Sequence, residues 1–137
     1  MRIMAVDFGD ARTGVAVSDL LGTLAGEAWV IHEWNMERVA QTLADEAVAR
    51  DVGTVVVGYP KNMNGTIGPR AEKSENLKQL IETKCDIEVL LWDERMTTMS
   101  AHRILSDTGK RGKKRKQTID AVAASLILES YLRQKPE

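Results

Sequence analysis

The sequence has only one cysteine and no long apolar run. Because Cys85 has no second cysteine to pair with, no intrachain disulfide can form, which suits a reducing compartment. No apolar run approaches the roughly 20 residues that a membrane-spanning helix needs. The N-terminal residues also lack the basic, apolar and small-residue regions of a signal peptide. We therefore expect a cytoplasmic protein with no membrane contact.

Internal repeats and linkers long enough to divide the chain are also lacking. The 137 residues fit one domain of ordinary size, which can bury a hydrophobic core without disulfides. The hydrophobic fraction of 43% and the charged fraction of 28% are ordinary for a globular protein. The sequence therefore predicts a single domain over residues 1–137.

The net charge of −1 is small, but the charges are unevenly spread. Residues 110–116 read Lys-Arg-Gly-Lys-Lys-Arg-Lys, and without these six cations the rest of the chain carries −7. Such a basic segment can neutralise the phosphates of a nucleic acid. It is equally typical of a solvated loop, and composition alone does not decide between the two.

The apolar pattern changes along the chain from strands to alternating helices and strands. Strands are predicted over residues 2–8, 14–18, 24–32, 54–58 and 87–92. Helices are predicted from Asn35 to about Arg50, from Pro69 to about Lys84, from Thr97 or Thr98 to Gly109, and from about Thr118 to Arg133. This order predicts an α/β fold in which a three-strand antiparallel meander and two further strands form a mixed five-stranded sheet flanked by helices. It matches the ribonuclease H arrangement.

Two carboxylates stand at predicted strand ends, where the pattern expects apolar residues. Asp7 shares a face with Ala5 and is therefore expected to be half buried. Glu94 follows the strand over 87–92 and shares a face with Trp92. Each has a structural alternative, since Asp7 could accept hydrogen bonds in the following turn and Glu94 could pair with the arginine next to it.

A third carboxylate, Asp120, lies on the last predicted helix. Ala123 and Ala124, one turn further on, should pack on the sheet, so Asp120 borders the buried stripe. A first-turn aspartate favoured by the helix dipole is the alternative, but it does not explain the apolar face. Together with Asp7 and Glu94, this carboxylate predicts a site for a hard cation such as Mg²⁺. Two such ions about 3.5–4 Å apart can activate water and stabilise the leaving oxygen in phosphodiester cleavage.

Four motifs, in a fixed order and spacing, cover nearly the whole chain. They are Asp7-Phe8-Gly9-x-x-Arg12-x-Gly14-Val15-Ala16-x-Ser18-Asp19, Val57-Gly58-x-Pro60-x-Asn62-Met63-Asn64-Gly65-Thr66, Asp93-Glu94-Arg95-x-Thr97-Thr98 and Lys116-x-x-x-Asp120-x-x-Ala123-Ala124. In these motifs the chain resembles the YqgF/RuvX family of pre-16S ribosomal RNA nucleases, which are also described as Holliday-junction-resolvase-like. Any one motif would be weak, whereas the four together are highly specific.

The resemblance implies an RNase H-like nuclease of the bacterial cytoplasm that matures the 5′ end of 16S rRNA with Mg²⁺ or Mn²⁺. It places the catalytic and metal-binding triad at Asp7, Glu94 and Asp120. One departure is visible, because the chain has Asn64 where the family often has aspartate. This change removes a charge near the substrate loop and leaves the triad intact.

The remaining candidate residues concern nucleic-acid binding. Arg12 could contact a phosphate, or it could pair with Asp10 or Asp19. The loop around Asn64 could lie beside the scissile phosphate, or it could be an ordinary surface turn. The basic segment lies just upstream of Asp120, which favours a role in substrate binding. Its candidate residues are Lys113, Lys114, Arg115 and Lys116.

Three alternatives remain open at this point. The same site could resolve branched DNA such as a Holliday junction, which requires paired active sites. An Asp-x-Gly start also occurs in actin-like phosphotransferases, which need two such domains around ATP. A non-catalytic nucleic-acid-binding module would bind RNA in a salt-dependent way without cleaving it. The expected partners are RNA or branched DNA, with ribosomal particles as a further candidate, and the sequence does not indicate the oligomeric state.

Overall fold

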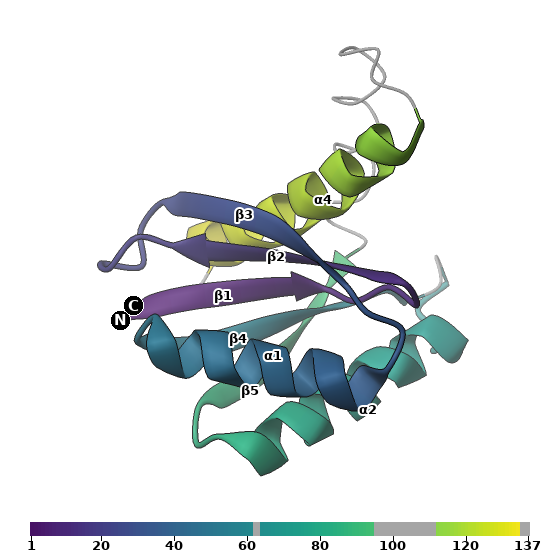
Figure 1. Ribbon diagram of the computed structural model, residues 1–137, viewed down its shortest axis with the longest axis horizontal. Coiled ribbons are helices and arrows are strands. Elements are labelled where there is room, and N and C mark those ends of the chain that lie inside the picture. The colour runs from purple at the N-terminus through teal and green to yellow at the C-terminus, as the bar shows by residue number, and fades with distance from the viewer. Residues whose placement is uncertain (62–63, 95–111, 135–137) are drawn as a thin grey trace.

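Five strands form one mixed sheet in the computed structural model of the chain (Figure 1). The structure describes residues 1–61, 64–94 and 112–134, and of residues 112–118 it describes the backbone alone. The strands are β1 (Arg2–Asp7), β2 (Arg12–Ser18), β3 (Ala25–His32), β4 (Val52–Tyr59) and β5 (Glu88–Asp93). Their order across the sheet is β3-β2-β1-β4-β5.

The strand directions confirm the predicted meander. β1 pairs with β2, and β2 with β3, in antiparallel fashion, whereas β1 with β4 and β4 with β5 are parallel pairs. β2 begins at Arg12, two residues before its predicted start, and Arg12 lies opposite His32 of β3. Because β1, β4 and β5 are parallel, their last residues lie at one end of the sheet, which we call its carboxyl end.

Two helices begin at the predicted start signals. α1 (Met36–Ala49) is capped by Asn35, whose side-chain oxygen accepts a hydrogen bond from the backbone N–H of Arg38 at 3.1 Å. α2 (Pro69–Lys84) has proline at its first position, where the missing N–H has no partner to lose. Within the described residues, none of the helices is long and apolar enough to cross a membrane.

The remaining described helix, α4 (Gly112–Gln134), begins before Thr118, its predicted start. The predicted start was therefore too late, and residues 112–116 of the basic segment are helical. The physical reason is that lysine and arginine are good helix formers, so a run of them extends a helix readily. The helix predicted from Thr97 or Thr98 to Gly109 lies outside the described residues.

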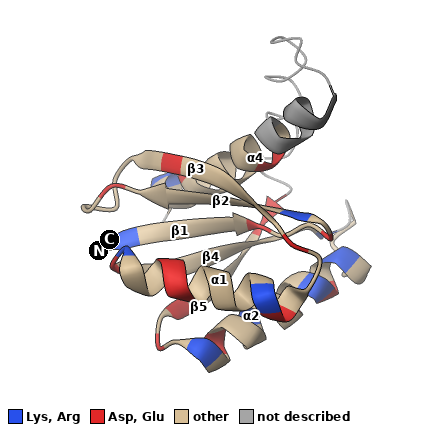
Figure 2. Cartoon of the chain, viewed as in Figure 1, with Lys and Arg blue, Asp and Glu red and all other residues tan. Residues whose placement is uncertain are grey.

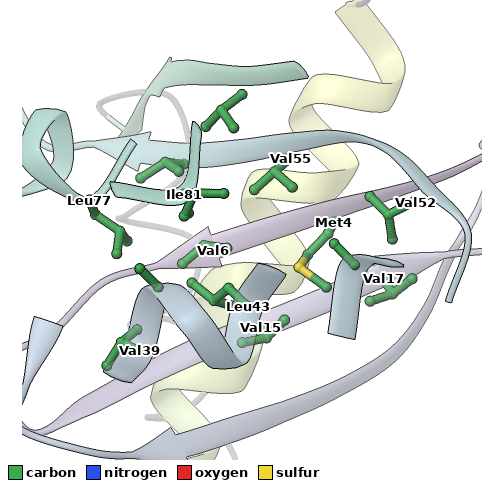
Figure 3. Close-up of a cluster of buried hydrophobic side chains, with 14 residues drawn as sticks. Met4, Val6, Val15, Val17, Val39, Leu43, Val52, Val55, Leu77 and Ile81 are labelled. Carbon is green, nitrogen blue, oxygen red and sulfur yellow. The ribbon is translucent and has the colours of Figure 1, made fainter. Parts of the chain in front are cut away.

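The sheet separates two apolar layers. α1 and α2 cover one face and pack on each other, and α4 crosses the opposite face (Figure 1). Because side chains alternate along a strand, Met4 and Val6 of β1 point to α1 and α2, whereas Ile3 and Ala5 point to α4. Figure 3 shows the apolar layer between the sheet and helices α1 and α2, where side chains from both helices meet those of the strands. The alternation decides which residues at the carboxyl end face α4.

Candidate active site

Alternation within β1 and β5 places two carboxylates on the α4 side of the sheet, at its carboxyl end. Asp7, the last residue of β1, follows Ala5 onto this face and is partly buried. Trp92 of β5 packs in the apolar layer between the sheet and α4. Glu94, two residues further on, therefore lies on the same side of the sheet. The indole N–H of Trp92 donates to Ser130 Oγ of α4 at 3.1 Å, which ties β5 to that helix.

Two glycines allow the surrounding elements to approach this point. A Cβ atom at Gly14 of β2 would lie only 2.6 Å from the backbone carbonyl carbon of Asp120, so a larger residue would push α4 away. A Cβ atom at Gly58 of β4 would lie 2.8 Å from Glu94 Cδ and 2.8 Å from Ile127 Cδ1. The site therefore depends on bare backbone as well as on its charged side chains.

The third carboxylate, Asp120 on α4, is held by Arg12. Arg12 Nε donates to Asp120 Oδ2 at 3.0 Å, and the two side chains are 34% and 22% exposed. Burial raises the pKa of Asp120, whereas the hydrogen bond and the charge of Arg12 lower it. The charges of His32 and Arg70 lower this pKa further. Asp120 also raises the pKa of Asp7, so the two carboxylates lie within electrostatic reach of each other.

Asp7 and Glu94 form a hydrogen-bonded carboxyl pair. Burial is the main reason why the pKa of Asp7 lies well above its ordinary value of 3.8, and the charge of Glu94 and the hydrogen bond raise it further. Burial also raises the pKa of Glu94, while the hydrogen bond with Asp7 lowers it. Two carboxyl groups form a hydrogen bond only when one of them keeps its proton, so the pair shares one proton while this hydrogen bond exists.

The donor atoms of this cluster fit a divalent cation in part. Carboxylate oxygens are the ligands that Mg²⁺ and Mn²⁺ prefer, and Asp7 and Glu94 already bring theirs together. Across residues 1–61, 64–94 and 112–134, however, no three His, Cys, Asp or Glu side chains are grouped to hold one ion. The carboxylate of Asp120 is bound to Arg12. The predicted triad therefore converges as a close pair with a third carboxylate nearby.

Comparison with known proteins identifies the family. Residues 1–134 match the family model RuvX, described as Holliday junction resolvase. The chain belongs to the RuvX family. A relative from Geobacillus sp. (strain WCH70) is 47% identical over 137 residues, which cover 98% of this chain and 99% of that protein, and is named "Putative pre-16S rRNA nuclease". A relative of the same name from Listeria monocytogenes serotype 4b (strain F2365) is 46% identical, covering 96% of this chain and 97% of that protein.

Solved structures share the fold of this RuvX-family chain. Thermus thermophilus RuvC in complex with a Holliday junction substrate has a TM-score of 0.59 at 14% identity, covering 98% of this chain and 96% of that one. The fowlpox virus resolvase with Holliday junction DNA has a TM-score of 0.61 at 12% identity and covers both chains completely. At such identities the likeness concerns the fold, and it confirms the RNase H-like prediction. The RuvX match also includes the Asp-x-Gly segment that suggested an actin-like phosphotransferase.

The structure places the predicted nucleic-acid-binding residues of this RuvX-family chain in three different settings. Arg12 pairs with Asp120, and not with Asp10 or Asp19 as the sequence suggested. It therefore lies beside the carboxylate cluster, which consists of Asp7, Glu94 and Asp120. The side-chain oxygen of Asn64 accepts from Thr66 N at 3.1 Å and from Thr66 Oγ1 at 2.7 Å, so it closes its own exposed turn. The backbone of residues 113–116 lies in α4, and their side chains are outside the described part of the chain.

Reasoning from the sequence missed Arg70 and His32, whose charges act on the site carboxylates. Arg70, near the start of α2, lowers the pKa of all three site carboxylates. A signal for it was available, because cations are disfavoured at the start of a helix and α2 has two of them there. His32 comes close to Asp120 through the register of β2 and β3, which no local pattern indicates.

Proposed function

We propose that this chain is a divalent-metal-dependent nuclease that hydrolyses phosphodiester bonds in the 5′-end maturation of precursor 16S rRNA. The observation that carries the proposal is the Asp7–Glu94 pair with Asp120 beside it, at the carboxyl end of an RNase H-like sheet. Relatives that are 46% and 47% identical over nearly the whole chain are named for this activity, which supports rRNA as the substrate. Such a substrate makes ribosome biogenesis in the cytoplasm the setting of the reaction.

Asp7 and Glu94 are the residues that would hold the cation, Mg²⁺ or Mn²⁺, in place of the proton they share. A cation bound there activates water and stabilises negative charge on the departing oxygen. Asp7 must lose its proton before it can act as a ligand, so its raised pKa opposes loading at low pH. Asp120 would become a further ligand once Arg12 left this carboxylate for a phosphate oxygen, which a guanidinium also binds.

The test is cleavage of a 5′-labelled RNA that spans the precursor 16S end, with Mn²⁺ or with a chelator. Asp7→Asn keeps the shape of the side chain and removes a charged ligand. We expect cleavage to fall by at least about 10²-fold, the scale observed when one group that stabilises the transition state is lost. Asp45→Asn is the matched control, because Asp45 is an exposed carboxylate of α1 that accepts from Gln41, and it should cleave like wild type. Full cleavage by Asp7→Asn would refute the assigned site.

Junction resolution is the second candidate, and the description of the matching family model favours it. A labelled four-way DNA junction in the same assay separates the two activities, since metal-dependent cutting of the junction but not of the RNA supports resolution. Resolution needs paired active sites, so a chain that stays monomeric on the junction speaks against it. Salt-dependent binding by wild type without cleavage of either substrate would support the non-catalytic module instead.

A further inference from the structure

A pocket of about 170 Å³ lies between the loop after β1 and the beginning of α2. Phe8, Gly9 and Asp10 line it from the loop, and Arg70 and Lys73 line it from the helix. We call it the Arg70 pocket. Figure 2 shows basic segments at the beginning of α2, at the same end of the molecule as the carboxyl end of β1. The pocket therefore adjoins the end of the strand that carries Asp7.

The two cations of the Arg70 pocket have different partners. Lys73 Nζ lies 2.7 Å from Asp10 Oδ1, and this hydrogen bond holds the pKa of the Asp10 carboxyl below its ordinary range. Arg70 is exposed, and no carboxylate in the described part of the chain forms a salt bridge with it. Because Lys73 balances Asp10, Arg70 leaves the pocket with a net positive charge.

Arg70 is also close to the carboxylate cluster. Its charge lowers the pKa of Asp7, Glu94 and Asp120, so its guanidinium lies within electrostatic reach of all three. Arg70 thus connects the pocket with the proposed reaction site. A guanidinium without a carboxylate partner of its own is suited to a bidentate contact with a phosphate.

A competing explanation is that Arg70 only reduces repulsion among the three carboxylates. That role needs neither a cavity nor a second cation, Lys73, in the next turn of the helix. The first turn of α2 adds positive potential from its backbone N–H groups, and Gly68 offers no side chain to cap them. The charge of Arg70, which is not balanced by a carboxylate partner, and the N-terminus of α2 therefore favour an anion as the occupant of this cavity.

We propose that the Arg70 pocket binds a backbone phosphate of the nucleic-acid strand, next to the phosphate that is cleaved at the Asp7–Glu94 pair. The proposal rests on the proposed nuclease function and adds a subsite that positions its substrate. Arg70 donates to the phosphate oxygens, and the charge of Lys73 keeps Asp10 from repelling them. Since phosphates carry no sequence information, this subsite fixes the register of the strand and not the choice of bases.

The test measures binding in the absence of cleavage. The anisotropy of a 5′-fluorescein-labelled single-stranded RNA is followed against protein concentration, with a chelator present, at about 50 to 200 mM salt. Arg70→Gln removes the charge, and loss of one phosphate contact should reduce the slope of log K against log salt by about 0.7. Over this range the wild-type affinity should therefore fall about 2.6-fold more than that of the variant.

Lys78→Gln is the matched control, because Lys78 lies on the same helix and pairs with Glu82 at 3.0 Å, outside the pocket. It should keep the wild-type slope. A labelled four-way DNA junction is the second probe, and it distinguishes a subsite for RNA from one for DNA. Equal slopes for wild type and Arg70→Gln on both probes overturn the proposal. A reduction that Lys78→Gln matches also overturns it, since overall charge would then explain the effect.

Failure of the proposed nuclease function gives a different result. If wild type cleaves neither probe while Arg70→Gln has the reduced slope, the phosphate subsite is supported and the nuclease function is not. If Arg70→Gln changes only the pH dependence of cleavage and keeps the wild-type slope, Arg70 acts on the carboxylates alone and the subsite is refuted. Arg70 is exposed, so the variant should melt like wild type, and melting curves check this.

Discussion

Replacing Gly14 by alanine tests whether the close crossing of α4 on β2 brings Asp120 to the site. The new Cβ atom would overlap the carbonyl oxygen of Asp120 and lie 2.6 Å from its carbonyl carbon. Ordinary contact begins at 3.4 Å, and the carbonyl oxygen lies even closer than the carbon, so the helix would have to move away by more than about 0.8 Å. No side-chain rotation can relieve the contact, because the obstructing atoms belong to the backbone.

The displacement should lower both stability and activity. Overpacking of a tight contact costs about 1–3 kcal/mol of the free energy of unfolding. Movement of α4 would also carry Asp120 away from Arg12 and Asp7, and a displacement of about 1 Å at a reacting group costs roughly 10²-fold in rate. We therefore expect Gly14→Ala to fold, to unfold at lower urea concentration, and to cleave roughly 10- to 100-fold more slowly.

A second glycine provides the control for this experiment. At Gly53 of β4 the new Cβ atom would lie 2.9 Å from Met1 Sδ and 3.0 Å from Met1 Cβ, which belong to the exposed side chain of the first residue, and this side chain can move aside. Gly53→Ala should therefore unfold and cleave like wild type. Urea unfolding and the Mn²⁺-dependent RNA assay measure the two effects separately. If Gly14→Ala matched Gly53→Ala in both, the argument from backbone packing would be refuted.

Two further predictions concern protonation. The pKa of Asp7 in the folded chain lies above its ordinary value of 3.8, so folded protein binds more protons than unfolded protein and its stability falls as pH rises through this interval. With a chelator at pH 7, Asp7→Asn should therefore have a higher melting temperature than wild type, and this difference should vanish at pH values below 3.8. Mg²⁺ should raise the melting temperature of wild type alone. A variant with a lower melting temperature than wild type under chelator at pH 7 would contradict this. Arg12→Gln removes a cause that lowers the pKa of Asp120, so the acidic limb of the pH–rate profile should move to higher pH. An unmoved limb would mean that Asp120 does not titrate in the active enzyme.

Alternation along the strands was sufficient to predict the faces of the carboxylates. Asp7 shares its face with Ala5, and Glu94 shares its face with Trp92, and the structure places both on the side of α4. A two-residue period depends only on neighbouring residues, and so it can be read from the sequence. The predicted helix start at Asn35 was confirmed for the same reason, since the cap that Asn35 provides is formed within one turn of its helix.

Contacts between distant residues could not be predicted. Arg12 and Asp120 are 108 residues apart in sequence, and their pairing depends on how closely α4 crosses β2 at Gly14. The role of Arg70 depends on where α2 begins relative to the end of β1, which follows from the packing of two layers. The early start of α4 at Gly112 was missed because a run of cations is typical of loops, although each cation favours a helix.

The site is a place where the fold holds unfavourable charges together. Desolvation raises the pKa of Asp7, Glu94 and Asp120, and repulsion by the other two carboxylates raises that of Asp7 further. The proton shared by Asp7 and Glu94, the salt bridge from Arg12 and the nearby charge of Arg70 reduce this cost. Under the proposed function, a divalent cation replaces the proton, and phosphates draw the two arginines away from the carboxylates. Each replacement makes the other more favourable, because the carboxylates that lose an arginine bind a cation more strongly. The same electrostatic conflict that lowers stability therefore couples the binding of metal to the binding of nucleic acid.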